Sequence, residues 1–563
     1  MSKKDQFVPL VATAVVLGLT VPLPSTNALA EEIGPALEEV DQPLALPSFG
    51  PEAPPPAAPK AVQVRRPASV SDEEYAAEQA AARTGPAPLG PVAVPIPARG
   101  AVGIQATVPV SFEGLDRQTS ANNGSVFIPP DTIVSKSTKR VIEATNSAIR
   151  LSQSSGAVLA TRDLNSFFGA AVANGLLFDP KVYFDRNSTT KRRRFYVIAL
   201  QQTGRGNANL ADNVSRGWLA ISRKPNPKNL TNHWCRYNID FRSEIGTANE
   251  SWGDYPSIGA GRDSMSISIN NFRFSDDVFR FARIHVFNKR IASNNKGSCP
   301  SLTRFVFQPS ASAGNFALFT IQPAQHYTSP SSGTNTTNPA YFLSTTRGSS
   351  DQYHVHRIRN VFGGSPTYTR VSLTSGSYGI PPDGNQPGTA TLIDSGDNRM
   401  LQVAGIGNTL VGQFTTVCNF TNGTPNESCT RTPRVTVGFG GGGALTASIP
   451  ENTFAGFSDN IFVHHVSIAT DTALRSASTW QFNGTGGGGF FHSSAAMIKS
   501  VNAAWAGVQT YAVGNCPYLL GRAGDFSGAQ LDPSLFGFWL AGEKAITLGG
   551  SCQWGTRVVR VNP

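Results

Sequence analysis

Four aspartates stand directly before short apolar segments that are typical of buried strands. Asp254 lies in GDYPSIGAGRDSMSISINNF, and Asp525 lies in the similar segment GDFSGAQLDPSLFGFWLAGE. Asp131 and Asp179 precede comparable segments, and His492 in FFHSSAAM occupies a similar place. If these segments are the first strands of repeated units around one axis, the five side chains should meet at one axial mouth.

Clustered carboxylates permit two interpretations. An aspartate commonly caps a turn, because its oxygens accept hydrogen bonds from nearby backbone N–H groups. Alternatively, a ring of carboxylates holds a hard cation such as Ca²⁺ or a polar ligand, since like charges repel unless something neutralises them. Asp254 and Asp525 are the candidate metal ligands.

The same residues permit a catalytic interpretation. Retaining glycosidases pair a nucleophile with an acid of raised pKa, and Tyr255, Asp254 and Glu543 could take these parts. Glu543 follows Trp539 on a strongly apolar segment, so it is expected to face the interior. A buried glutamate more often pairs with an arginine or a backbone amide. The sequence has no nucleophile elbow, phosphate-binding loop or dinucleotide fingerprint.

Two pairs of histidines carry weaker signals. His354 and His356 alternate in YHVHRIRN, which predicts that both lie on one side of a strand, as solvent-facing surface or as a two-histidine metal site. His464 and His465 are adjacent, so they are predicted to point to opposite faces and to form no common site.

Aromatic residues near Asp254 offer a surface on which a sugar ring could stack. These residues are Trp252, Tyr255, Phe272 and Phe274. The alternative is packing in the core, because most of the 33 phenylalanines must be buried.

From about residue 101 the sequence repeats one pattern, in which a short apolar segment is followed by three more alternating segments. Only 15% of the residues are charged and 55 are glycine, which favours a β protein rich in turns. Radial four-stranded sheets are the arrangement of a β-propeller. The repeats predict one all-β propeller of about seven blades, with six as the alternative. The last unit has three strands, so IQATVPVSFEGL, from Ile104, is expected to complete it.

The six cysteines are placed by the same repeats. Cys235 and Cys299 lie near the fourth strands of two consecutive units, and Cys516 and Cys552 near the third strands of the last two. Equivalent positions in neighbouring blades lie side by side. The predicted disulfides are Cys235–Cys299, Cys418–Cys429 and Cys516–Cys552, one of the 15 possible connectivities.

Several phrases carry a resemblance to a known family. They are IPPDTIVSKSTKRVIEATNSAIRL, FDPKVYFDRNSTTKRRRFYVIALQ, GDYPSIGAGRDSMSISINN and GRAGDFSGAQLDPSLFGFWLAGEKA followed by WGTRVVRV. The chain from about residue 125 to 563 resembles a family of exported bacterial β-propellers that is distantly sialidase-like. The S-x-D-x-G-x-T-W turn of true sialidases is absent, and ATDTALRSASTW only partly resembles it. The arginines that grip a sialic-acid carboxylate cannot be assigned to positions here.

The N-terminus differs in composition from the rest. Residues 1–30 have a basic start, an apolar run and the small residues Ala28-Leu29-Ala30, which predict a cleaved signal peptide. Residues 31–100 are rich in Pro and Ala and predict a disordered tether, with one short helix capped by Ser71 and Glu74. The propeller occupies 101–563, and no later segment is long and apolar enough to span a bilayer.

The net charge of +10 does not indicate a nucleic-acid partner, because the basic run from Lys191 to Arg194 is typical of a solvated hairpin turn. An even cysteine count with a signal peptide favours export to the cell surface, periplasm or medium. We therefore expect an exported, non-catalytic binding or scaffold protein of the cell envelope, with a glycan or a protein as ligand at a propeller face. The alternative is a glycan-active, sialidase-like hydrolase. Ca²⁺ is the one cofactor considered.

Overall fold

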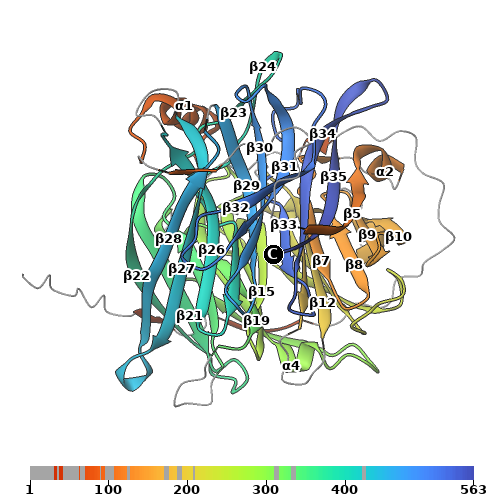
Figure 1. Cartoon of the computed structure of the whole chain (residues 1–563). Helices are drawn as coiled ribbons and strands as arrows, with labels where there is room; N and C mark the ends of the chain where they lie inside the picture. The colour runs from red at the N-terminus through yellow and green to blue at the C-terminus, as the bar shows by residue number, and fades with distance from the viewer. Residues whose placement is uncertain are drawn as a thin grey trace, which may run out of the picture.

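The alternating segments form antiparallel strands in the computed structural model of the chain (Figure 1). The structure describes residues 31–33, 37–41, 62–63, 70–88, 91–94, 107–122, 127–169, 177–186, 193–206, 209–309, 316–330, 338–420, 426–458 and 460–563. The predicted signal peptide, residues 1–30, and Lys191 and Arg192 of the basic run lie outside these residues.

Consecutive groups of four antiparallel strands build the body. The first three groups are β7 (Ile133–Lys136), β8 (Arg140–Ala144), β9 (Ala148–Gln153) and β10 (Val158–Asp163); β11 (Phe178–Asp185), β12 (Arg194–Thr203), β13 (Val214–Ser222) and β14 (Trp234–Asp240); β15 (Ser251–Ala260), β16 (Ser264–Arg273), β17 (Phe279–Asn288) and β18 (Leu302–Phe307). The next is β19 (Gln322–Thr328), β20 (Ala340–Thr345), β21 (Ser350–Arg359) and β22 (Thr367–Tyr378).

Three further groups follow. They are β25 (Gln402–Ile406), β26 (Thr409–Cys418), β27 (Glu427–Phe439) and β28 (Leu445–Gly456); β29 (Ile461–Thr470), β30 (Ser476–Gly484), β31 (Phe490–Lys499) and β32 (Ala506–Ala512); β33 (Gly528–Leu531), β34 (Phe538–Leu548), β35 (Ser551–Asn562) and β5 (Thr107–Asp116). A separate hairpin, β23 (Gly384–Gln386) and β24 (Thr389–Ile393), precedes the fifth group.

The first strands of these groups form a closed ring. Each contacts the next in chain order, β7, β11, β15, β19, β25, β29 and β33, and β33 contacts β7. The final group is completed by β5, which pairs antiparallel with β35, as the sequence predicted for the segment from Ile104. The prediction of an all-β propeller is confirmed, while the number of blades stays a prediction that the ring supports.

The division of the fifth and sixth groups differs from the one predicted. The alternating pattern predicts a fifth unit that starts at TATLIDS and RMLQVAGIG and resumes at NIFVHHVSIA. NIFVHHVSIA is instead β29, the first strand of the sixth group. His492 lies on β31, the third strand, so the prediction that it precedes a first strand is wrong. The β23–β24 hairpin caused the error, because its TATLIDS segment reads like a first strand.

The described pieces of the N-terminal region are attached to the body. β1 (Glu31–Ile33) pairs with β22, β2 (Leu37–Asp41) with β18, β3 (Val62–Gln63) with β6 (Phe127–Ile128), and β4 (Val92–Ala93) with β28. The predicted short helix is α1 (Asp72–Thr84), and the Ser71 hydroxyl caps it by accepting from the Glu74 N–H at 3.1 Å. These pieces are paired rather than free, and a domain boundary near residue 101 stays a prediction.

The remaining helices are short connections between strands. They are α2 (Arg117–Asn122), α3 (Leu164–Phe168), α4 (Lys289–Ala292), and the single turns η1 (Leu210–Asp212), η2 (Phe316–Leu318) and η3 (Gly441–Gly443). Within the part of the chain that the structure describes, no helix is long and apolar enough to cross a membrane.

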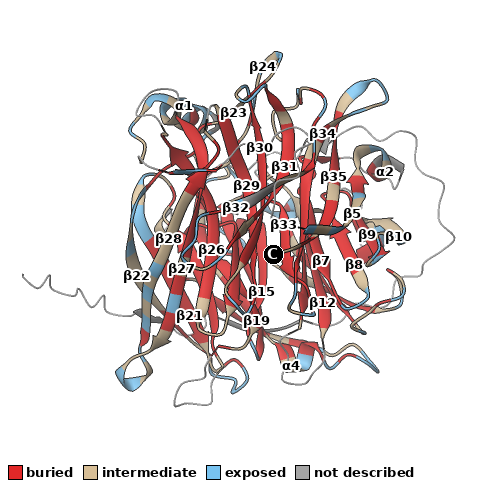
Figure 2. Cartoon of the chain, in the orientation of Figure 1, coloured by how far each residue is buried: buried red, intermediate tan, exposed pale blue. Residues whose placement is uncertain are grey.

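Burial follows the strands, whereas the exposed residues gather at loops and at the ends of long strands (Figure 2). Trp252, Phe272, Phe274, Phe279 and Phe319 form one cluster in the body. The proposed stacking surface is therefore core, apart from Tyr255.

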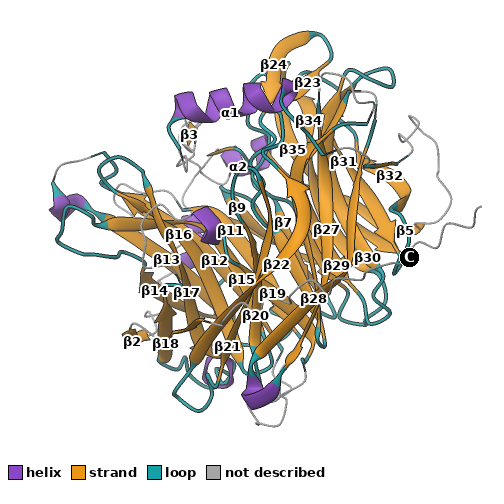
Figure 3. Ribbon diagram, turned by 90° about the vertical axis from the view of Figure 1, so that its left-hand side faces the viewer, coloured by secondary structure: helices purple, strands orange, loops and turns teal. Residues whose placement is uncertain are grey.

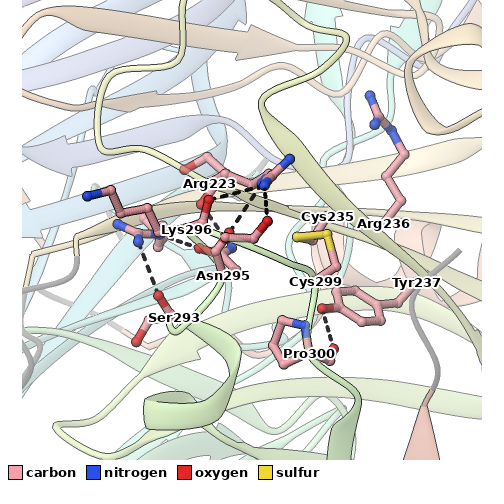
Figure 4. The surroundings of a disulfide bond; sticks show 12 residues. Arg223, Cys235, Arg236, Tyr237, Ser293, Asn295, Lys296, Cys299 and Pro300 are labelled. Atoms are coloured by element: carbon pink, nitrogen blue, oxygen red, sulfur yellow. Dashed lines mark hydrogen bonds between the residues drawn. A yellow bond between two sulfur atoms is a disulfide. The ribbon is translucent and has the colours of Figure 1, made fainter. Parts of the chain in front are cut away.

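All three predicted disulfides are present. Figure 4 shows Cys235 joined to Cys299, next to the bond that the Tyr237 hydroxyl donates to the Pro300 carbonyl oxygen at 2.8 Å. Arg223 donates to the carbonyl oxygens of Asn295 and Lys296 beside this disulfide, so the segment before β18 is fastened to the second group. Cys516 follows β32 instead of preceding a third strand, although its predicted partner, Cys552, is correct.

Buried glutamines cross the axis of the ring. Gln402 of β25 donates to the Ala529 carbonyl oxygen of β33 at 2.7 Å, and these two strands are not neighbours in the ring. Gln530 of β33 accepts from the Lys136 N–H of the neighbouring strand β7 at 2.7 Å and donates to the Phe184 carbonyl oxygen of β11 at 3.5 Å. Buried polar side chains therefore form hydrogen bonds between first strands in the centre of the ring.

Candidate functional site

Five residues with a left-handed backbone lie within first strands or just before them. Their φ angles lie between 45° and 54°, and they are Asp131, Asp179, Tyr255, Thr320 and His465. Three of them, Asp179, Tyr255 and His465, lie at bulges in the pairing of the first and second strands. Non-glycine residues rarely adopt this conformation, and such positions cluster at functional sites. The repeated bulge turns these side chains toward one end of the ring.

A pocket opens at this end. It has about 400 Å³ of empty volume, including the solvent at its opening, and its lining residues are Asp254, Tyr255, Ser395, Gly396, Asp397, Arg399, Leu401, His465 and Asp525. The pocket therefore combines residues of β15 and β29, in the third and sixth groups, with residues of the segments that precede β25 and β33. The structure brings Asp254 and Asp525 to one site, 271 residues apart in sequence.

Two of the three lining carboxylates are held by arginines. Arg399 donates from Nε and Nη2 to the two carboxylate oxygens of Asp397, each at 2.7 Å. Arg522 donates to Asp525 Oδ2 at 2.5 Å. Asp254 forms no ion pair within the residues that the structure describes. Burial raises the pKa of Asp254 to about 6, against the opposing charge of Arg399.

Tyr255 forms one wall of the pocket and reaches across the axis. Its hydroxyl donates to the Asp525 backbone carbonyl oxygen at 3.3 Å, and its ring meets Phe526 edge to face. The Arg399 guanidinium lies 4.3 Å from the ring centroid, and Lys181 Nζ lies 5.1 Å from it. Burial raises the pKa of Tyr255 well above its ordinary value, so the phenol is neutral and acts as a donor.

Asp131 and Asp179 lie near the pocket but do not line it. Asn146 joins them, because its side-chain N–H donates to Asp131 Oδ2 at 2.5 Å and its oxygen accepts from the Asp179 N–H at 2.5 Å. Asp131 Oδ1 also accepts from the Asp525 N–H at 2.6 Å. Asp131 thus caps backbone between the first and last groups, which is the structural role considered above.

A buried lysine lies among these carboxylates. Burial lowers the pKa of Lys181 to about 7, although Asp179 and Asp131 oppose this shift. Burial, followed by the charge of Asp525, raises the pKa of Asp131 to about 7. Lys181, Arg399 and Arg522 place positive charge beside these carboxylates, which is the role that the sequence predicted for a metal ion.

Glu543 is buried and is not among the residues that line the pocket. It accepts from the Thr132 N–H at 3.0 Å, so it pairs with a backbone amide. Burial, and then the charge of Asp131, raises the pKa of Glu543 well above its ordinary value. The catalytic acid role for Glu543 stays a prediction, and its placement outside the pocket does not favour it.

The histidines differ most from expectation. The left-handed backbone at His465 breaks the strand alternation, so the imidazoles of His464 and His465 meet with their Nδ1 atoms 2.9 Å apart. The prediction that they point to opposite faces is wrong. His492 is buried and stacks on His464 at 5.3 Å between ring centroids. Only His465 of these three lines the pocket.

His354 and His356 share one side of β21, as predicted, but both are buried. His354 contacts the hydroxyls of Thr346 and Ser372, and His356 contacts those of Ser344 and Tyr368. The prediction of a solvent-facing pair is wrong, because these histidines hydrogen-bond the neighbouring strands.

No group of three or more His, Cys, Asp or Glu side chains is arranged to hold a metal ion among the described residues. Calcium binding by Asp254 and Asp525 therefore stays a prediction, with Arg399 and Arg522 already neutralising part of the negative charge.

The segment DSGDNR, from Asp394 to Arg399, was not recognised in the sequence. It supplies Ser395, Gly396, Asp397 and Arg399 to the pocket. The segment precedes β25 as Asp131 precedes β7 and Asp525 precedes β33, so the repeat pattern could have indicated it. Asp179 and Asp254 lie inside β11 and β15, so the prediction that these two precede first strands is wrong. The Ser395 hydroxyl is buried and has no hydrogen-bond partner among the described residues.

No family model and no curated protein matches the sequence. The chain is similar in structure to an α-L-arabinofuranosidase of Fusarium graminearum solved with an iminosugar inhibitor, with 7% identity, a TM-score of 0.34, and coverage of 82% of this chain and 98% of that chain. It is also similar to Trypanosoma rangeli sialidase with sialic acid, with 9% identity, a TM-score of 0.34, and coverage of 74% and 57%. Drosophila Plexin A in complex with Semaphorin 1b shows 7% identity, a TM-score of 0.25, and coverage of 81% and 88%.

These similarities concern the fold alone and carry no argument about a ligand or a reaction. Membership of an exported bacterial family stays a proposal.

Proposed function

We propose that the protein is an exported, non-catalytic propeller that binds a glycan at the pocket lined by Asp254, Tyr255, Ser395 and Arg399. The observation that carries this proposal is the concentration of polar groups and one aromatic ring in a single pocket. Binding sites typically combine a concave wall with a few convergent polar groups.

The chemistry of the pocket suits a molecule with many hydroxyls. Carboxylates accept hydrogen bonds from sugar hydroxyls, and charged acceptors form the stronger bonds. The buried Ser395 hydroxyl lacks a partner among the described residues, and a buried polar group left unpaired costs about 1–3 kcal/mol. A ligand that bonds this hydroxyl would recover that free energy.

Export is supported by the three disulfides, since such bonds persist in oxidising compartments. The signal peptide over residues 1–30 and attachment to the cell envelope belong to the proposal. A protein ligand at the same face is the other partner of the binding hypothesis.

A glycan-active hydrolase is the second candidate, and one observation favours it. Asp254 and Asp525 line the same pocket, and burial raises the pKa of Asp254 to about 6, which suits an acid that exchanges a proton near neutral pH. Tyr255 would be the nucleophile, but its raised pKa requires a base, and no carboxylate contact to its hydroxyl is present among the described residues.

The decisive experiment measures binding and turnover on one preparation. Purified protein is applied to a glycan array and to a set of fluorogenic glycosides, together with Asp254→Asn and Tyr255→Phe. Asp351→Asn is the matched control, since Asp351 is exposed on β21. Binding without turnover that is lost in Asp254→Asn supports the proposal. Turnover lost in Asp254→Asn or Tyr255→Phe supports the hydrolase, and the absence of both activities contradicts both.

A further inference from the structure

We infer that the pocket selects glycans carrying a protonated amine, that is amino sugars, over acidic sugars. This inference rests on the proposed glycan binding and names its ligand class. It depends on which carboxylates at the pocket form ion pairs with arginines and on which carboxylate does not.

The arginines near the pocket are engaged by carboxylates. Arg399 uses two donors on Asp397, and Arg522 binds Asp525. An acidic sugar would have to compete with these bidentate or short contacts for a guanidinium. The cost is high because breaking a buried pair leaves an uncompensated carboxylate.

Lys181 is not an alternative anion site. It is buried, does not line the pocket, and lies over the Phe526 ring with Nζ 2.8 Å from the centroid. Its electrostatic partners are Asp179, Asp131 and Asp525, which hold the opposite charge. Lys181 therefore acts on carboxylates within the protein and contacts the aromatic rings of Phe526 and Tyr255.

Asp254 is the lining carboxylate that remains without an ion-pair partner in the described part of the chain. An ammonium group presents three donors and one positive charge. The Asp254 carboxylate can accept one of these donors, and the Ser395 hydroxyl, buried without a partner among the described residues, can accept another. A carboxylate placed at the same point would meet the negative charge of Asp254, which Arg399 and Arg205 oppose without forming an ion pair with it.

The test compares matched oligosaccharides on the full-length protein. The probes are a set of amino-sugar oligomers of several linkages, their fully N-acetylated counterparts, and uronic-acid oligomers of equal length, with affinity measured by calorimetry. We expect the free amines to bind at least tenfold more tightly than the N-acetylated forms, and the uronic acids not to bind. The preference for the amine should weaken at high salt, because it depends on charge.

Asp254→Asn should reduce the preference for the amine to near unity, and Asp351→Asn should retain it. Melting curves of both variants establish that they fold, and the salt dependence of the wild-type protein tests the inference independently of any variant. Equal affinity for amine and N-acetyl forms, or preference for uronic acids, overturns the inference but leaves glycan binding intact. Absence of binding to every glycan overturns the proposed function and this inference together.

Discussion

The Tyr75 hydroxyl donates a hydrogen bond to Asp394 Oδ1 at 2.7 Å, and thereby joins α1 to the segment that lines the pocket. Tyr75 also donates to the Gly396 carbonyl oxygen at 3.0 Å, and Gln79 donates to the same oxygen at 2.9 Å. Figures 1 and 3 show α1 and the β23–β24 hairpin at the same end of the molecule. A helix placed before the predicted propeller thus supports the wall of the candidate site.

A series of contacts between charged side chains also connects α1 to the pocket. Arg347 Nη1 donates to Glu78 Oε1 of α1 at 3.0 Å, and Arg347 Nε lies 3.8 Å from Asp397 Oδ2. Asp397 in turn holds Arg399. The orientation of the pocket guanidinium is therefore linked to the position of the helix.

Tyr75→Phe is expected to loosen the pocket wall. It removes the one O–H donor that Asp394 and Gly396 share and the acceptor of the Gln79 side-chain N–H, at about 1 kcal/mol for each hydrogen bond, from a partly buried site. We expect ligand affinity to fall roughly fivefold, which corresponds to about 1 kcal/mol, with the body remaining folded. Calorimetric titration and a melting curve measure the two effects separately. Glu73→Gln, an exposed change in the same helix, should alter neither. Loss of stability with unchanged affinity would limit Tyr75 to a structural role.

His492→Leu is expected to make the protein more resistant to acid. Burial lowers the pKa of His492 to about 3, whereas an unfolded histidine titrates near 6.5. Between these values the unfolded state binds a proton that the folded state does not, so the free energy of unfolding falls as the pH falls. The limiting slope is about 1.4 kcal/mol per pH unit for one proton.

Comparing His492→Leu with the wild-type protein separates the proton that His492 binds on unfolding from the protons that other groups bind or release. Burial raises the pKa of Asp131 to about 7, and such carboxyl groups act in the opposite direction over the same range. Urea unfolding at pH 7 and pH 5 for wild type and His492→Leu gives the difference in slope. Parallel pH dependence in the two proteins would show that His492 titrates normally.

Chelator is expected to leave the melting temperature unchanged. The charges of Arg399, Arg522 and Lys181 already oppose those of the carboxylates, so the site does not require a cation for stability. Melting curves with EDTA and with excess Ca²⁺ check this. A Ca²⁺-dependent gain near 2.7 kcal/mol at a hundredfold excess over Kd, absent in Asp254→Asn and Asp525→Asn, would instead establish the calcium site.

Cys516→Ser should lower stability by about 2–4 kcal/mol, mainly because the unfolded chain gains freedom. Cys516 is bonded to Cys552, 36 positions further along the chain. The substitution therefore leaves the Cys552 thiol free, and only Cys552 should then react with a thiol probe. Reactivity at Cys299 would contradict the pairing. Cys552→Ser is the matched control, and it should expose Cys516 to the same extent.

The repeated strands and the disulfides could be predicted because they depend on local alternation and on unit register. Four strands per group and the closing role of β5 followed from the same pattern. The fifth group was misassigned, since β23 and β24 form a hairpin whose sequence resembles the start of a unit. Periodicity identifies strands but does not identify which strand begins a new group.

The candidate site was predictable only in part. Asp254 and Asp525 carried a repeated signal, and the pocket contains both. The left-handed backbone at His465 could not be read from HHV, because any strand pattern predicts alternation there. Lys181 and Asn146 gave no signal, since their importance comes from burial among carboxylates supplied by other groups. Such tertiary placement has no counterpart in a single sequence.

The closing strand has a consequence for the order in which the chain can fold. Asp116 of β5 pairs with Gly555 of β35, which lies 439 residues further along the chain. Glu143 secures this junction, accepting from the Leu115 N–H at 3.0 Å and from the Thr556 hydroxyl. A pairing across such a sequence separation forms slowly, because a large loss of chain entropy precedes its contacts. During synthesis β5 is made early and has no partner, so the ring can close only after β35 has been made.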